Sequence, residues 1–188
     1  MEGTPEVCER FARDLQRMAG QPAAKSQLFT EFNENEAADL WHYIAQAVPL
    51  LLEASPGAAI FKIAQLPARH HPLFAQLSAI AERAGLPHSL LARACGVVYF
   101  ALVPITDEAD SVRRLAEVAS AIFQLCAKEN AAVMLPWCPT ALKRTVNIWG
   151  PPQPNLDLMR SLKTARDPQN IFAPGRITGN FNPSSNTP

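Results

Sequence analysis

The stretch SLLARACGVVYFALVP, residues 89–104, decides the fold that we predict for this chain. It is too long and too rich in β-favouring residues to form one ordinary strand. Gly96 lies near its middle, and a glycine inside such a run is typical of a tight turn. We therefore expect two short strands that are joined at Gly96.

The segments on either side extend this pair into a larger pattern. Apolar runs predict two further strands, and apolar stripes at helical spacing predict two helices, at 58–66, 131–137, 72–84 and 109–128 respectively. The order from 58 to 137 is then β-α-β-β-α-β. This order predicts an α+β fold of the ferredoxin-like class, with an antiparallel sheet and both helices on one face. Residues 143–149 are expected to add an edge strand, with Val146 and Ile148 facing inward.

Further helices are expected near both ends of the chain, at 5–19, 36–48 and 155–165. The longest predicted helix, 109–128, has Thr106 and Asp107 before it as candidate caps. The chain is expected to divide into four parts: an N-terminal helical segment, 1–57, a ferredoxin-like domain, 58–150, a C-terminal helix and strap, 151–178, and a disordered polar tail, 179–188.

The composition narrows the class of protein. Lys plus Arg and Asp plus Glu number 17 each, so the chain carries no net charge that would favour nucleic acid as a partner. No apolar run is long enough for a membrane span and no cleavable signal stands at the N-terminus, so we expect a cytoplasmic protein. The cysteines show no CxxC spacing and are expected to be small buried hydrophobic residues: Cys8, Cys95, Cys126 and Cys138.

The sequence contains no motif for a known catalytic mechanism. G-x-S-x-G, the phosphate loop, G-x-G-x-x-G and HExxH are all absent, and we identify no catalytic residue. His70 and His71 are adjacent, but no carboxylate or cysteine stands near them in the sequence, so we expect surface histidines rather than metal ligands.

Lys62 interrupts an otherwise apolar predicted strand. A charge there is costly unless it reaches the open face of the sheet or a partner. The preferred interpretation is a lysine on the uncovered face of an antiparallel sheet. The alternative is that Lys62, Arg93 and Arg144, all in predicted strands, present positive charge to a substrate carboxylate.

The C-terminal stretch LMRSLKTARDPQNIFAPGRI, residues 158–177, has an unusual order of features. Asp167-Pro168 is expected to end a helix, and Ile171-Phe172 could plug a hydrophobic slot. Pro174-Gly175 permits close approach of the backbone to another surface, where Arg176 would arrive as a cation. On the residues alone, a strap packed on its own domain is favoured over one wall of a site.

This stretch resembles the C-terminal signature of FAD-linked oxidases of the vanillyl-alcohol oxidase type, in which a helix ending in Lys precedes a DP, a short apolar plug and a PG(K/R). The chain more closely resembles the FAD-binding subunit of glycolate oxidase, the E subunit. Pieces similar to that subunit occur in its usual order: MAGQP, 18–22, ADLWHYI, 38–44, GVVYFAL, 96–102, and WGPPQPNLDLMRSLK, 149–163.

The resemblance implies a domain that caps the flavin of an FAD-dependent 2-hydroxy-acid oxidase, with Pro174, Gly175 and Arg176 as neighbours of FAD. It also implies as partners an FAD-binding domain and other glycolate oxidase subunits, including an iron–sulfur subunit, which could associate the complex with a membrane. Nothing in the sequence matches the glycine-rich FAD-binding domain of the family. We therefore expect this chain alone to be inactive and to bind FAD weakly.

Arg93 and Tyr99 stand roughly where catalytic relatives carry the histidines of a GHxGDGNxH-like motif, so no metal site is predicted. The competing hypothesis is a stand-alone ferredoxin-like module that binds a small ligand, or forms a homodimer through its open sheet face, and has no redox role.

Overall fold

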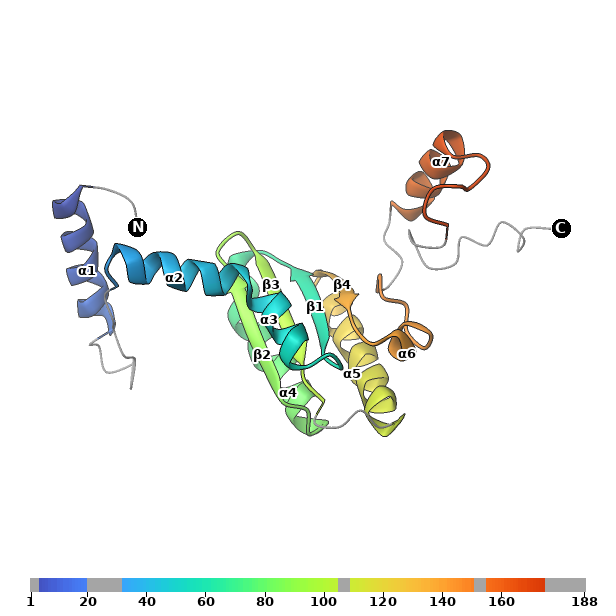
Figure 1. Cartoon of the computed structure of the whole chain (residues 1–188), viewed down its shortest axis with the longest axis horizontal. Coiled ribbons are helices and arrows are strands. Elements are labelled where there is room, and N and C mark those ends of the chain that lie inside the picture. Colours follow the sequence, from blue (N-terminus) through green and yellow to red (C-terminus); the bar gives the residue numbers. More distant parts are fainter. Residues whose placement is uncertain (1–3, 20–31, 105–108, 151–154, 175–188) are drawn as a thin grey trace. The chain divides into compact units, whose positions relative to one another are not determined.

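The computed structural model describes residues 4–19, 32–104, 109–150 and 155–174 (Figure 1). The chain forms two compact units, Met1–Leu50 and Leu51–Pro188, and each is described by itself. The domain boundary predicted at 57/58 stays a prediction, and the polar tail, 179–188, lies outside the described residues, as do the candidate caps Thr106 and Asp107. No helix in the described ranges is both long and apolar enough to cross a membrane.

The N-terminal unit contains α1, Pro5–Ala19, and α2, Glu34–Ala45, and α3, Ala47–Ala54, begins in it. Asn33 and Glu36 form a capping box at the start of α2, with hydrogen bonds of 3.0 and 2.8 Å between each side chain and the other residue's backbone N–H.

The single helix predicted at 36–48 is wrong at its C-terminal end, because the structure ends α2 at Ala45 and starts α3 after Gln46. Pro49 explains the interruption. Inside a continuous helix its ring would clash with the carbonyl of Ala45, whereas in the first turn of a new helix its missing N–H is no loss.

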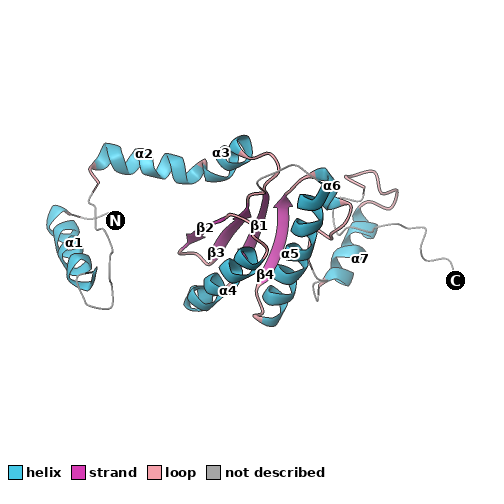
Figure 2. Ribbon diagram, turned by 90° about the horizontal axis from the view of Figure 1, so that it is seen from below, coloured by secondary structure: helices cyan, strands magenta, loops and turns pink. Residues whose placement is uncertain are grey.

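The second unit contains a four-stranded sheet of order β2-β3-β1-β4, in which every neighbouring pair is antiparallel. The strands are β1, Ala59–Ala64, β2, His88–Arg93, β3, Val97–Leu102, and β4, Ala132–Trp137. The helical elements of this unit are η1, Pro67–Arg69, α4, His70–Arg83, α5, Ala109–Lys128, α6, Thr140–Lys143, and α7, Leu156–Arg166. Figure 2 shows α4 and α5 on the same face of the sheet. The predicted α+β, ferredoxin-like fold is confirmed.

The core lies between the sheet and these two helices. Alternate residues of β1, among them Phe61 and Ile63, are fully buried in it, because successive side chains of a strand point to opposite faces. Phe61 packs edge-on against Phe123 of α5, with ring centroids 5.8 Å apart. Lys62, between the two buried residues, therefore belongs to the opposite face of the sheet.

The turn predicted at Gly96 is confirmed. Gly96 joins β2 to β3 with φ +90°, in the left-handed region that favours glycine, and its N–H donates to the carbonyl of Arg93 at 3.0 Å. A Cβ at this position would lie 2.6 Å from the carbonyl oxygen of Gln65. Close backbone contact and positive φ thus both require glycine.

We expect Gly96→Ala to lower the free energy of unfolding by at least about 3 kcal/mol, because backbone strain and a clash with backbone add together. Gly85→Ala is the matched control, since Gly85 also has positive φ, +63°, but a Cβ there would meet nothing within 4 Å. That variant is expected to lose only about 1 kcal/mol. Urea denaturation measures both, and equal losses would contradict the role of the Gln65 contact.

The edge strand predicted at 143–149 is wrong. Residues Thr140–Lys143 form the short helix α6, whose Leu142 is fully buried and whose turn continues to Val146 through a backbone hydrogen bond of 3.0 Å. Lys143 is thus helical, and the residues that follow it form turns rather than a strand. Val146 and Ile148 do pack against the core as predicted, and Leu135 N–H of β4 donates to the carbonyl of Ile148 at 2.7 Å.

His70 and Cys95 also differ from prediction. His70 is 8% exposed, begins α4, and packs its ring 5.3 Å from that of Phe74, so it is not a surface histidine, whereas His71 is exposed. Cys95 is exposed in the turn between β2 and β3, whereas Cys126 is buried as predicted. Burial raises the pKa of the Cys126 thiol to about 12, which keeps it protonated and inert.

Candidate functional site

The C-terminal segment of the described chain consists of α7 and the turns that follow it, 167–174. Helix α7 ends at Arg166, and its C-cap residue Asp167 has φ −140° and ψ 67°, which are not helical. Pro168 comes next. A residue before proline is driven away from the helical region, so the Asp-Pro pair ends the helix as predicted.

The carboxylate of Asp167 holds the residues that follow it in a turn through hydrogen bonds. Oδ1 accepts a hydrogen bond from Ile171 N–H at 2.8 Å, and Oδ2 accepts one from Phe172 N–H at 2.9 Å. The backbone takes part as well, because Asn170 N–H donates to the carbonyl of Asp167 at 2.9 Å. One buried side chain, 6% exposed, therefore satisfies two consecutive peptide groups of the turn.

Lys163 completes this arrangement, which we call the Asp167 hub (Lys163, Asp167, Ile171 and Phe172). Its ammonium pairs with Oδ2 of Asp167 and donates to the carbonyl of Phe172 at 2.7 Å. Lys163 first, and then the N–H groups of Ile171 and Phe172, hold the pKa of the Asp167 carboxyl below its usual range. The carboxylate is therefore charged at neutral pH.

The side chains that the hub presents are apolar and exposed. Ile171 is 65% exposed and Phe172 is 72% exposed, so their own segment does not bury the predicted plug. Three apolar residues of α7 are exposed with them: Leu158, Met159 and Leu162. Exposed apolar side chains that gather in one segment are often found where a protein meets a partner.

The predicted flavin neighbours lie at the end of this segment. Pro174 is exposed and directly follows Ala173, whose φ is +45°. Gly175 and Arg176 lie outside the described residues. The roles of Pro174, Gly175 and Arg176 beside FAD stay predictions.

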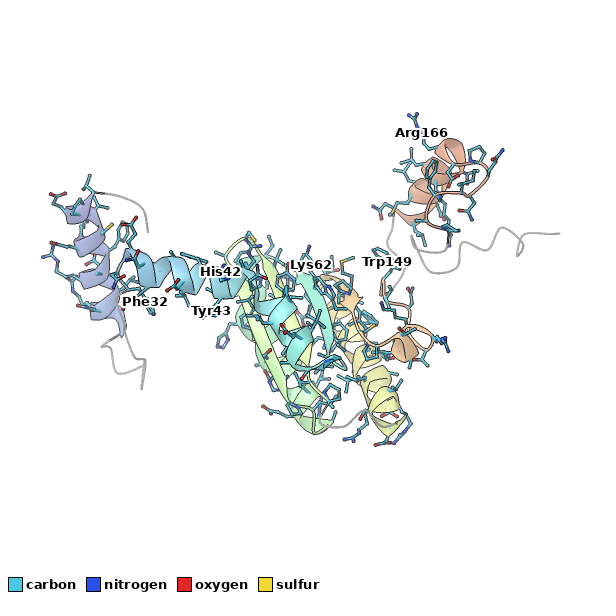
Figure 3. The ribbon with its side chains drawn as sticks, viewed as in Figure 1. Phe32, His42, Tyr43, Lys62, Trp149 and Arg166 are labelled. Atoms are coloured by element: carbon cyan, nitrogen blue, oxygen red, sulfur yellow. The ribbon has the colours of Figure 1, made fainter. Side chains whose placement is uncertain are left out.

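The second candidate region is the sheet face opposite α4 and α5. Lys62 of β1 is half-buried there (Figure 3). In the sheet it pairs with Tyr99 of β3 on one side and with Met134 of β4 on the other. Trp137 joins them, because its ring centroid is 6.2 Å from that of Tyr99. A cation between aromatic and thioether side chains can hold an anion whose body is apolar.

Of the three predicted substrate contacts, the register brings two to this face. Arg93 pairs with Val97 and Val97 with Ala64, two residues along from the Lys62 pair, so Arg93 and Lys62 share a face. Arg144 is not in a strand: it is the exposed C-cap residue of α6, which corrects its predicted placement. Within the described ranges, no cluster of three metal-ligating side chains occurs.

Comparison with known proteins bears on the C-terminal segment. Residues 151–177 match the model of the family described as FAD linked oxidases, C-terminal domain. The segment with the Asp167 hub resembles an FAD-linked oxidase C-terminus. The match covers the whole of α7 and supports this family for the C-terminal segment. A family of FAD-linked oxidases implies FAD in the full-length protein and an FAD-binding domain as partner. No curated protein matches the chain.

Sequence reasoning identified the Asp-Pro pair and the apolar plug but missed Lys163 as their partner. The signal was present, because Lys163 stands one helical turn before Asp167 and such i, i+4 pairs meet on a helix surface. The ring pair of Tyr99 and Trp137 was also missed, since nothing in the sequence reveals strand register across an intervening strand.

Proposed function

We propose that this chain is the cap and C-terminal part of an FAD-dependent oxidoreductase of the vanillyl-alcohol oxidase type, similar to the FAD-binding subunit of glycolate oxidase. Its FAD-binding domain belongs to another chain or to another part of a longer protein. The substrate is a small 2-hydroxy acid. Other glycolate oxidase subunits, including an iron–sulfur subunit, are its proposed partners, in the cytoplasm or at a membrane that those subunits contact.

One observation carries this proposal. The family match falls on the segment whose backbone is held by the Asp167 hub and whose apolar side chains, Ile171 and Phe172, are exposed. Burial of such side chains is favourable, and their own segment does not supply it. Docking against an FAD-binding domain accounts for the family match and for the exposure together.

The residues of this chain would orient the substrate, and FAD when bound would accept the hydride from the carbon that bears the hydroxyl. Lys62 and Arg93 share one sheet face and are the proposed partners of the acid's carboxylate. Pro174, Gly175 and Arg176 are proposed to lie beside the flavin. The described residues suggest no catalytic base and include no glycine-rich phosphate cradle, so the chain alone is expected to be inactive.

Flavin titration of the purified chain tests this proposal, alone and with the FAD-binding domain of an FAD-linked oxidase from which the matching C-terminal segment has been deleted. FAD fluorescence is expected to be quenched strongly only when both proteins are present. Arg176→Ala is expected to weaken FAD binding about tenfold, because it removes one charged contact. Arg166→Ala, at the exposed end of α7, is the control (Figure 3). Equal FAD affinity with and without the chain would overturn the proposal.

The alternative is a stand-alone ferredoxin-like module that binds a small ligand or forms a dimer. The observation that favours it is the core of the βαββαβ unit, which is closed by its own helices: Phe61, Phe100 and Leu135 are fully buried. A well-folded dimer that leaves FAD binding by the added domain unchanged would support this alternative.

A further inference from the structure

The Asp167 hub joins a helix to a turn through a single side chain. The carboxylate accepts hydrogen bonds from two consecutive peptide N–H groups, those of Ile171 and Phe172. The ammonium of Lys163 pairs with the same carboxylate and donates a hydrogen bond to the carbonyl of Phe172. Hydrogen bonds with a charged partner are stronger than neutral ones. The turn from 167 to 172 is thus fixed from inside its own segment.

The conformation that the hub holds is one that a free chain would seldom adopt. Asn170 has φ +52° and Ala173 has φ +45°. Asparagine tolerates positive φ better than most residues, but for alanine it is unfavourable. The side chains of Ile171 and Phe172 are largely exposed and do not themselves hold the turn in place. Their direction therefore depends on the backbone, and the backbone depends on the hub.

We propose that Asp167 is a positioning residue, which with Lys163 pre-forms the turn that presents Ile171 and Phe172 side by side to an apolar pocket of the FAD-binding domain. This inference rests on the proposed function. It adds that Asp167 sets the affinity with which this chain binds the FAD-binding domain. A pre-formed turn binds more tightly because less conformational entropy is lost on association.

The charge of Asp167 is essential to this role. Lys163 is the charged side chain that the described residues place against it, and the other contacts are peptide N–H groups. Asp167→Asn keeps the shape but removes the charge. The asparagine side chain has one acceptor oxygen, and an NH₂ group takes the place of the second carboxylate oxygen. This NH₂ group cannot accept a hydrogen bond from a peptide N–H, so one of the two peptide N–H bonds would be lost.

The test uses the full chain and the FAD-binding domain with its own C-terminal segment deleted, with affinity measured by calorimetry. Asp167→Asn is expected to weaken binding about tenfold or more, and Lys163→Met similarly, while Lys163→Arg restores most of the affinity. Asp157→Asn is the matched control, because Asp157 lies on the same helix and pairs with Arg160 at 3.1 Å, but its side chain is 93% exposed. It should change nothing.

A second readout separates positioning from general stability. In NMR spectra of the chain alone, the amide protons of Ile171 and Phe172 should shift as Asp167 titrates, at a pH below the ordinary range of an aspartate carboxyl because Lys163 lowers its pKa. The pKa of Asp167 is lower in the folded chain than in the unfolded chain. The stabilisation of the turn by the hub is therefore complete at pH values above the unfolded-state pKa, and it is lost as the pH falls through the folded-state pKa. Asp167→Asn should abolish the titration.

The outcomes distinguish the two proposals. Normal affinity of Asp167→Asn, while the wild-type chain binds, overturns the role of Asp167 and leaves the proposed function intact. Failure of the wild-type chain itself to bind overturns the proposed function and the docking role with it. Loss of affinity in Asp167→Asn and Lys163→Met, with recovery in Lys163→Arg, supports the inference.

Discussion

Phe172→Ala is expected to weaken the association between this chain and an FAD-binding domain about 30-fold or more, the effect of removing an aromatic anchor from the centre of an interface. Phe172 is 72% exposed and follows Ile171, which is also exposed, on the turn that Asp167 holds. Its backbone bonds survive the substitution, so the loss would report on the side chain alone. Calorimetric titration of the two purified proteins measures the effect.

The chain supplies its own control for this variant. Leu66 is 70% exposed and precedes η1, outside the C-terminal segment, so Leu66→Ala removes a comparable apolar area without touching the proposed interface. Its affinity should equal that of the wild type. If both variants bind equally well, the exposed plug is not an anchor.

Phe61→Ala is the second large effect, and it concerns stability. Phe61 is fully buried in β1 and packs against Phe123, so truncation would leave a cavity between the sheet and α5. Losses for buried phenylalanine are about 3–5 kcal/mol, a large part of the total stability of a domain. Thermal and urea unfolding would reveal the change.

Phe172→Ala serves as the comparison for Phe61→Ala, because the same substitution at an exposed site should change the free energy of unfolding by about 0.5 kcal/mol or less. Opposite results, with the exposed phenylalanine the more important for unfolding, would mean that the C-terminal segment is part of the core.

Local patterning was sufficient to predict most of the ferredoxin-like unit. The apolar stripe of residues 109–128 predicted α5. Gly96 predicted the turn between two strands, and its φ of +90° is a conformation that favours glycine. The predicted helix 36–48 failed at Gln46, because the ring of Pro49 would clash with the carbonyl of Ala45 in a continuous helix. The predicted strand 143–149 failed because burial of Leu142 turns the chain into α6 before the β-favouring residues begin.

The candidate site was only partly predictable, for a physical reason. Order along the chain identified Asp167-Pro168 as the end of α7 and Ile171-Phe172 as an apolar plug. It could not reveal that the same aspartate binds the peptide groups of the plug. Those bonds depend on how the backbone folds from 168 to 173, where positive φ at Asn170 is a conformation that asparagine tolerates but positive φ at Ala173 has no signal in the sequence. The register that places Arg93 and Lys62 on one face likewise depends on pairing between distant strands.

Hydrogen exchange of the full chain, measured with and without the FAD-binding domain, tests the central claim most directly. Peptides covering the turn 167–174 should exchange more slowly in the presence of that domain, while exchange in α5, on the far side of the sheet from Lys62, is unchanged. No slowing across 167–174, in a mixture that nevertheless forms a complex, would contradict the claim that this turn docks on the FAD-binding domain.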